Sequence, residues 1–288
     1  MKKENQILES LIKEIYPQYK LQVVSNFIGD EGSSTKSTQA IMLSGFYIHH
    51  EIKNAKFVLD ELHQQLREVY GARTKGILNE IQNPFDGVVH YSVRENPEIA
   101  IDNILDPLYD NCPIIYDYPA NSSVDLQVFD DVKKLVRIYK KANRIMINWT
   151  PIITDTKSIS DAELIMKSFK GYEDEDIFFV HSLVRGRMTK DGASNVYKAY
   201  DNNQLFNEMR EKGKLCTIRI DTVLNNDASE VISKYTQKQI AKFIADRDVG
   251  VLKGYAGTLL DMLHEDFYDD IKEMSFNSHG NIIKPYDF

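Results

Sequence analysis

The chain has 288 residues, of which 42% are hydrophobic and 27% are charged, and these proportions are ordinary for a globular protein. The formal net charge of −8 argues against broad nonspecific binding to nucleic acid. The two cysteines, Cys112 and Cys216, lie in apolar runs and have no spacing typical of a disulfide framework or a metal site. No signal peptide is evident, and no window approaches the roughly 18 consecutive apolar residues of a membrane span. We therefore expect a cytoplasmic protein without a membrane partner.

Apolar runs alternate with helical patterns from one end of the chain to the other. The runs predict strands over residues 20–28, 55–60, 87–93, 113–117, 144–149, 176–181 and 215–220. The helical patterns cover residues 5–16, 36–50, a segment ending near 70, then 97–108, 125–141, 159–170 and 194–211. This alternation predicts an α/β fold with a mostly parallel, doubly wound sheet flanked by helices.

The chain contains no internal repeat and no low-complexity linker, so we expect a single domain over residues 1–288. We expect an N-terminal helix over 1–19, a core over 20–235, C-terminal helices over 236–275 and a coil tail over 276–288.

A Gly/Ser-rich loop, Gly29-Asp30-Glu31-Gly32-Ser33-Ser34-Thr35-Lys36-Ser37-Thr38, follows the first strand and precedes a helix. This order is typical of a phosphate-binding P-loop, in which backbone N–H groups and the helix N-terminus hold phosphates. Lys36 would neutralise the phosphates, and the hydroxyl of Ser37 or Thr38 would ligate Mg²⁺. The candidate nucleotide-binding residues here are Gly29, Gly32, Ser33, Ser34, Thr35, Lys36, Ser37 and Thr38. The alternative is that Lys-Ser-Thr merely caps a helix.

Asp117 closes the apolar strand over 113–117 and is followed by Tyr118 and Pro119. An acid in this place can hold Mg²⁺ through its water shell, and the turn at Pro119 would keep the chain close to a γ-phosphate. An ordinary strand-ending aspartate in a turn is the alternative. In parallel sheets the ligand lies beyond the C-terminal strand ends, where both Asp117 and the Gly/Ser-rich loop fall. We therefore expect a metal site at Ser37 and Asp117.

Three segments resemble landmarks of the ParA/MinD-type ATPases, which have a deviant Walker A loop. Asp117-Tyr118-Pro119-Ala120-Asn121 is similar to their Asp-x-Pro-Ala-Gly segment. The stretch from Thr150-Pro151 to Ser158-Ile159-Ser160-Asp161-Ala162 resembles their next landmark, and Asp60 with Gln64 resembles their switch segment. The likeness covers residues 20–235 and is nearest to the diverged StbB- and TraL-like proteins of plasmid stability and conjugation.

The resemblance implies a P-loop NTPase-like protein that uses ATP and Mg²⁺. It implies catalytic roles for Lys36 and for Asp60, which would orient the attacking water, and a role for His181 in reading adenine. It further implies a homodimer that works with a DNA-binding adaptor protein in plasmid partition, DNA segregation or conjugative transfer. Direct DNA binding stays open, because the basic residues of the 125–141 helix are also typical of a solvated face.

Three departures from the family pattern favour a second interpretation. Glu31 occupies the place of the signature lysine, Thr35 that of a loop glycine, and Leu62 that of the second switch acid. An acid facing a triphosphate would repel it. The alternative is therefore a pseudo-NTPase interaction module that has lost hydrolysis or nucleotide binding, and a small-molecule ligase on the same fold is a third possibility.

Overall fold

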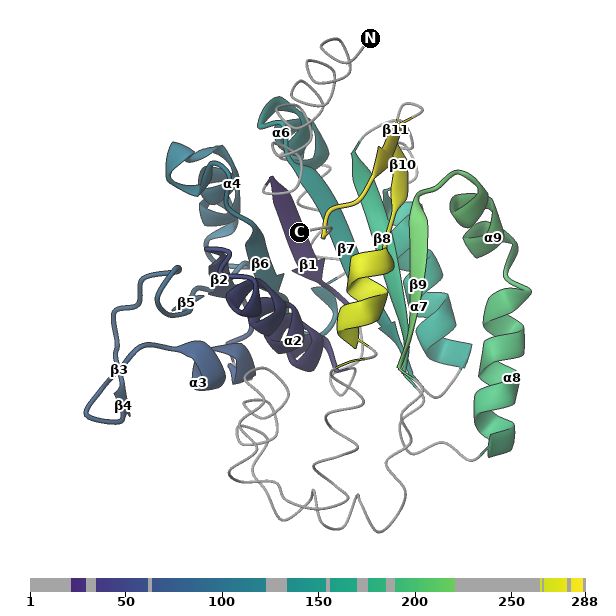
Figure 1. Cartoon of the computed structure of the whole chain (residues 1–288), viewed down its shortest axis with the longest axis horizontal. Helices are drawn as coiled ribbons and strands as arrows, with labels where there is room; N and C mark the ends of the chain where they lie inside the picture. Colours follow the sequence, from purple (N-terminus) through teal and green to yellow (C-terminus); the bar gives the residue numbers. More distant parts are fainter. Residues whose placement is uncertain are drawn as a thin grey trace, which may run out of the picture.

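A seven-stranded parallel sheet forms the centre of the computed structural model, in the order β5-β2-β6-β1-β7-β8-β9 (Figure 1). The structure describes residues 22–29, 35–61, 64–122, 134–153, 156–169, 176–184, 190–220, 265, 267–278 and 281–286. The strands are β1 (Val23–Phe27), β2 (Ala55–Val58), β5 (Val89–His90), β6 (Ile114–Asp117), β7 (Ile145–Ile152), β8 (Ile177–Val184) and β9 (Leu215–Ile220). Each neighbouring pair is parallel. The predicted α/β class is therefore confirmed, whereas the single-domain organisation stays a prediction.

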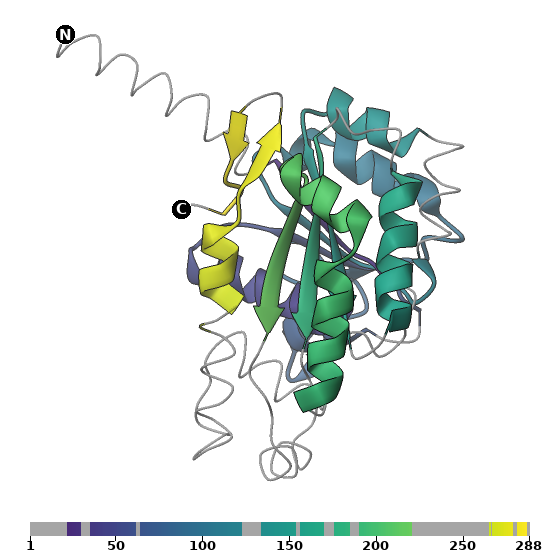
Figure 2. The ribbon, with the colours of Figure 1, turned by 90° about the vertical axis from the view of Figure 1, so that its right-hand side faces the viewer.

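Helices cover both faces of the sheet (Figure 2). They are α2 (Lys36–His49), α3 (Gln65–Tyr70), α4 (Pro97–Leu105), α6 (Leu135–Lys141), α7 (Thr156–Ser168), α8 (Lys190–Asp201) and α9 (Gln204–Glu211), with a 3-10 turn η1 (Pro107–Tyr109) and a helical stretch at 267–273. One hydrophobic core joins the sheet to α2, α3 and residues 267–286, and a second joins it to α4, α6, α7, α8 and α9.

This double cover explains why the strands are apolar throughout. Successive side chains of a strand point to opposite faces, so Val23 and Phe27 enter the first core while Val24 and Ile28 enter the second. All eight residues of β7 are buried for the same reason.

The C-terminal segment differs from the expected coil tail. Residues Phe276–Ser278 (β10) and Asn281–Ile283 (β11) form an antiparallel hairpin. The backbone N–H of Asn277 donates to the Gly213 carbonyl at 2.9 Å, and the Phe276 ring lies 4.6 Å from that of Phe178. Tyr286 is fully buried and its hydroxyl lies 3.2 Å from that of Ser25 on β1. These long-range contacts order a segment whose local sequence shows no strand pattern.

Other helix and strand boundaries also differ from those predicted from the sequence. The helix expected over 194–211 is two helices, α8 and α9, because Asn203 caps α9 by accepting a hydrogen bond from Phe206 N at 3.1 Å. The strand expected over 87–93 shortens to β5, and a small hairpin of β3 (Arg73–Thr74) and β4 (Ile77–Leu78) precedes it. The helix expected over 5–16 lies outside the described residues, as do most of the 236–275 helices and residues 123–133. Among the helices that the structure describes, none has the length and apolar character to cross a bilayer.

The strand order places β1 where the direction of the chain reverses. β6 pairs with one side of β1, and β7, which follows β6 in sequence, pairs with the other side. In doubly wound sheets, ligands bind beyond the C-terminal strand ends at such a switch point. The fold therefore directs attention to the ends of β1 and β6.

Candidate functional site

Lys36 is the first residue of α2, directly beyond the loop that follows β1. Its side chain is only 6% exposed, and its Nζ donates to the Gly29 carbonyl at 3.2 Å. Among the described residues, no side chain caps the N-terminus of α2 and no acid lies in its first turn. The positive end of the helix and a buried ammonium group therefore face the loop, as an anion site requires. Residues 30–34, which include Glu31, Gly32, Ser33 and Ser34, lie outside the described part of the chain.

Asp117 lies next to this helix end because β6 lies between β1 and β2. The register pairs it with Phe27 of β1 and with Val58 of β2. Backbone hydrogen bonds hold it there: Tyr118 N donates to Phe27 O at 3.1 Å, and Leu59 N donates to Asp117 O at 2.9 Å. The carboxyl group is fully buried, and neither oxygen has a hydrogen-bond partner of good geometry among the described residues. A buried carboxyl group in such surroundings is either protonated or needs a compensating cation.

The electrostatic surroundings of Asp117 give the same indication. Burial raises the pKa of the Asp117 carboxyl to about 7, against the opposing effects of the Ser37 hydroxyl and the Lys36 ammonium. The nearby Asp60 raises this pKa further. Asp117 therefore titrates near neutral pH, and a divalent cation beside it would favour its ionised form.

The structure brings most of the described candidate residues to one edge of the sheet. Asp60 follows β2 by two residues and lies near enough to Asp117 to shift its pKa. Thr38 belongs to the first turn of α2 and is partly buried, as is Pro119, two residues beyond Asp117. The residues that meet at this edge are Gly29, Thr35, Lys36, Ser37, Thr38, Asp60, Asp117 and Pro119.

His181 lies apart from this cluster. β8 continues to Val184, so His181 falls within the strand rather than at its end. Its side chain is fully buried, with Nδ1 3.1 Å from the Tyr200 hydroxyl and its ring 4.6 Å from that of Phe206. Burial, with a contribution from the charge of Arg210, lowers the pKa of His181 to about 3, so the imidazole is neutral. These interior contacts place His181 outside the cluster at the ends of β1 and β6.

Gln39 links the loop to the sheet, and sequence reasoning missed it. It is almost fully buried, its Nε2 donates to Thr35 Oγ1 at 3.1 Å, and its Oε1 accepts from Ser182 Oγ at 2.8 Å. The i, i+4 spacing of Thr35 and Gln39 was the only available signal, whereas the contact with Ser182 comes from the fold.

Thr35, at the position where a phosphate-binding P-loop usually has glycine, has a left-handed backbone with φ 63° and ψ 9°. This conformation costs a β-branched residue about 1–2 kcal/mol, and glycine adopts it freely. We expect Thr35→Gly to raise the free energy of unfolding by about 1 kcal/mol, net of the lost Gln39 hydrogen bond. Urea denaturation of both proteins would measure this change in the free energy of unfolding.

Thr38→Gly, three residues further on, is the matched control. Thr38 lies within α2, where glycine should lower the free energy of unfolding by several tenths of a kcal/mol. If both substitutions change the free energy of unfolding in the same direction, the backbone at Thr35 is not strained.

The oxygen ligands at this edge fit a hard cation. Ser37 offers a hydroxyl and Asp117 a carboxylate, and Mg²⁺ is commonly held by one or two such groups while it keeps several waters. Within the described ranges, no group of three or more His, Cys, Asp or Glu residues is placed to hold a metal ion.

We compared the chain with known protein families, curated proteins and solved structures. No model of a known protein family matches this chain, and no curated protein matches it in sequence. One matching solved structure is a nucleotide-binding protein from Archaeoglobus fulgidus, determined in complex with ADP. It is 13% identical, the alignment covers 93% of this chain and 97% of that one, and the TM-score is 0.40. The function is therefore inferred from the geometry of the site itself.

Proposed function

We propose that this protein binds a Mg²⁺–nucleoside phosphate at the C-terminal ends of β1 and β6. The observation that carries the proposal is the fully buried Asp117 carboxyl group beside Ser37 and Lys36, without a hydrogen-bond partner of good geometry among the described residues. Lys36 and the N-terminus of α2 would bind the phosphates. Ser37 and Asp117 would hold Mg²⁺, which would draw charge from the phosphate oxygens and offset the buried acid.

The finer part of the proposal is an ATP-dependent switch. We infer that Asp60, which shares the edge with Asp117, positions a water molecule for attack on the terminal phosphate of ATP. By the resemblance to ParA/MinD-type ATPases, such a switch would form a homodimer and engage a DNA-binding adaptor in plasmid partition, DNA segregation or conjugative transfer. A nucleotide-binding module without hydrolysis is the second candidate, and the strained Thr35 beside Lys36 favours it.

Calorimetric titration of Mg·ADP and Mg·ATP into the full chain tests the binding site. We expect saturable binding that Lys36→Ala weakens about 10- to 100-fold, because a charge-assisted contact with phosphate is lost. Lys198→Ala, which removes an exposed lysine of α8, should leave the affinity unchanged. Absence of binding at millimolar nucleotide would refute the proposal, and unchanged affinity in Lys36→Ala would place the nucleotide elsewhere.

Release of inorganic phosphate from Mg·ATP then separates the two candidates. A switch hydrolyses ATP and loses this activity in Asp60→Asn while ADP affinity persists. A module without hydrolysis binds both nucleotides, and neither the wild type nor Asp60→Asn releases phosphate.

A further inference from the structure

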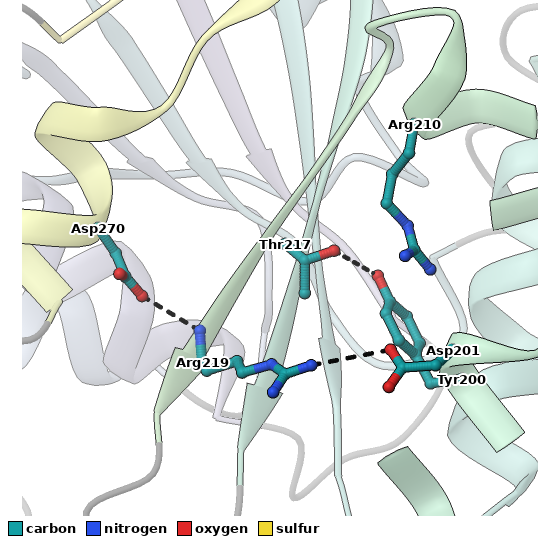
Figure 3. A pocket seen from close by; sticks show the side chains of 6 residues that line it. All are labelled: Tyr200, Asp201, Arg210, Thr217, Arg219 and Asp270. Carbon is teal, nitrogen blue, oxygen red and sulfur yellow. Dashed lines mark hydrogen bonds and ion pairs between the residues drawn. The ribbon is translucent and has the colours of Figure 1, made fainter. Parts of the chain in front are cut away.

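A second pocket lies at the edge of the sheet beside β9, separated from β1 by β7 and β8. Its volume is about 440 Å³, enough for a small metabolite. The residues that line it are Tyr200, Asp201, Arg210, Thr217, Arg219 and Asp270 (Figure 3). This pocket is distinct from the proposed nucleotide site, and it contains a charge that its neighbours do not neutralise.

That charge belongs to Arg210. Its guanidinium carbon lies 5.2 Å from the centroid of the Tyr200 ring, a cation–π arrangement that holds the group against the pocket wall. Its Nε and Nη2 are enclosed, and neither has a hydrogen-bond partner in the part of the chain that the structure describes. A covered guanidinium with unused N–H groups is unfavourable until an acceptor offsets it.

The two acids of the pocket are directed to Arg219 instead. Asp201 Oδ1 lies 3.8 Å from Arg219 Nη2, and Asp270 Oδ2 accepts a hydrogen bond from Arg219 N at 3.1 Å (Figure 3). Both interactions lie on the Arg219 side of the pocket. Neither acid forms an ion pair with Arg210 in the described residues, so Arg210 is the cation of the pocket that has no counter-ion beside it.

Two hydroxyl groups lie between the arginines. The hydroxyls of Tyr200 and Thr217 are 2.8 Å apart (Figure 3). Burial raises the pKa of Tyr200 to about 12, so the phenol keeps its proton at neutral pH. The pocket thus combines one uncompensated cation with neutral hydroxyl groups that can donate to or accept from a ligand.

We propose that this pocket binds a small carboxylate, with the Arg210 guanidinium as its charge partner. Since Nε and Nη2 are enclosed, a carboxylate in the pocket contacts the guanidinium at Nη1, and its charge offsets the delocalised positive charge of the group. The carboxylates of Asp201 and Asp270 repel a phosphate dianion more than a single negative charge, which favours a carboxylate over a phosphate.

The test is a titration of the full chain with acetate, benzoate and inorganic phosphate, followed by protein amide shifts in NMR spectra. We expect the two carboxylates to bind in the millimolar range, to shift amides of β9 and α9, and to bind more tightly than phosphate. Arg210→Met should weaken carboxylate binding about 10-fold or more, and Arg210→Lys should weaken it less, because lysine keeps the positive charge.

Arg137→Met, at an exposed arginine on α6, should leave carboxylate affinity unchanged. If Arg210→Met does not fold, the proposal is tested by the ratio of the carboxylate dissociation constants of Arg210→Lys and wild type. The proposal is overturned if neither carboxylate shifts the amides of β9 and α9, if phosphate shifts these amides with the same affinity as the carboxylates, or if the Arg210 variants bind like wild type.

Discussion

Asp117→Asn is expected to stabilise the ligand-free protein at pH 8 by about 2–4 kcal/mol while removing Mg²⁺-dependent nucleotide binding. The carboxyl group is fully buried, and burial raises its pKa from the ordinary 3.8 to about 7. Above pH 7 the folded protein must hold a carboxylate that prefers water, whereas an asparagine carries no charge there. The same substitution removes the carboxylate that we propose as a ligand of Mg²⁺.

The pH dependence gives the sign of this effect. Between pH 4 and 7 the folded state binds a proton at Asp117 that the unfolded state has released, so the stability attributable to this group falls as pH rises through 7. The gain from Asp117→Asn should therefore be largest at pH 8 and vanish near pH 4. Urea denaturation at both pH values, with calorimetry of Mg·ADP binding, would measure the two effects.

Asp102→Asn provides the matched control, because Asp102 is an exposed acid of α4. It should change neither stability nor nucleotide affinity appreciably. A destabilising Asp117→Asn at pH 8, or one that preserves Mg²⁺-dependent binding, would show that the buried acid has another purpose.

Arg144→Met is expected to lower the free energy of unfolding by about 3 kcal/mol or more. Arg144 is 2% exposed and precedes β7. Its Nε donates to the Ile104 carbonyl at 2.9 Å and its Nη2 to the Tyr109 carbonyl at 2.9 Å, with a longer contact of 3.5 Å from Nη1 to Cys112 O. Methionine fills part of the space but removes the guanidinium donors from these carbonyls, and of the three the Tyr109 carbonyl still accepts from Cys112 N at 3.1 Å.

The measurement is urea denaturation followed by the fluorescence of Trp149, the single tryptophan of the chain. Arg137→Met makes the same change at the exposed position on α6 and should alter stability by less than about 0.5 kcal/mol. A loss of similar size in both variants would contradict a special role for the buried guanidinium. Asp110, whose side chain is 62% exposed and 3.8 Å from Arg144, should add little.

The sequence was sufficient to predict the sheet and the gathering of several candidate residues. Apolar runs alternating with helices indicate parallel strands, and parallel strands bring their C-terminal ends to one edge. Lys36 and Asp117, 81 positions apart in the numbering, meet for this reason, and Asp60 lies near them. The topology of the sheet alone explains their proximity.

Sequence reasoning could not place His181 or the C-terminal hairpin. An apolar run shows that a strand is buried but not where the edge of the sheet falls along it, and β8 extends three residues beyond His181. The hairpin of β10 and β11 depends on contacts with Gly213 and Phe178, which a local pattern does not contain. The pocket at Arg210 likewise combines residues from α8, α9, β9 and the 267–273 helix.

The burial of Tyr286 has a consequence for biosynthesis. Its hydroxyl meets Ser25 on the central strand across 261 positions of sequence, and its ring lies 6.3 Å from Trp149. A ribosome adds about 5–20 residues per second, so β1 emerges many seconds before the residue that completes its core. During that interval the nascent chain lacks part of the cover over one apolar face of the sheet. Packing of the first core around β1 is therefore finished only after Tyr286 has been synthesised.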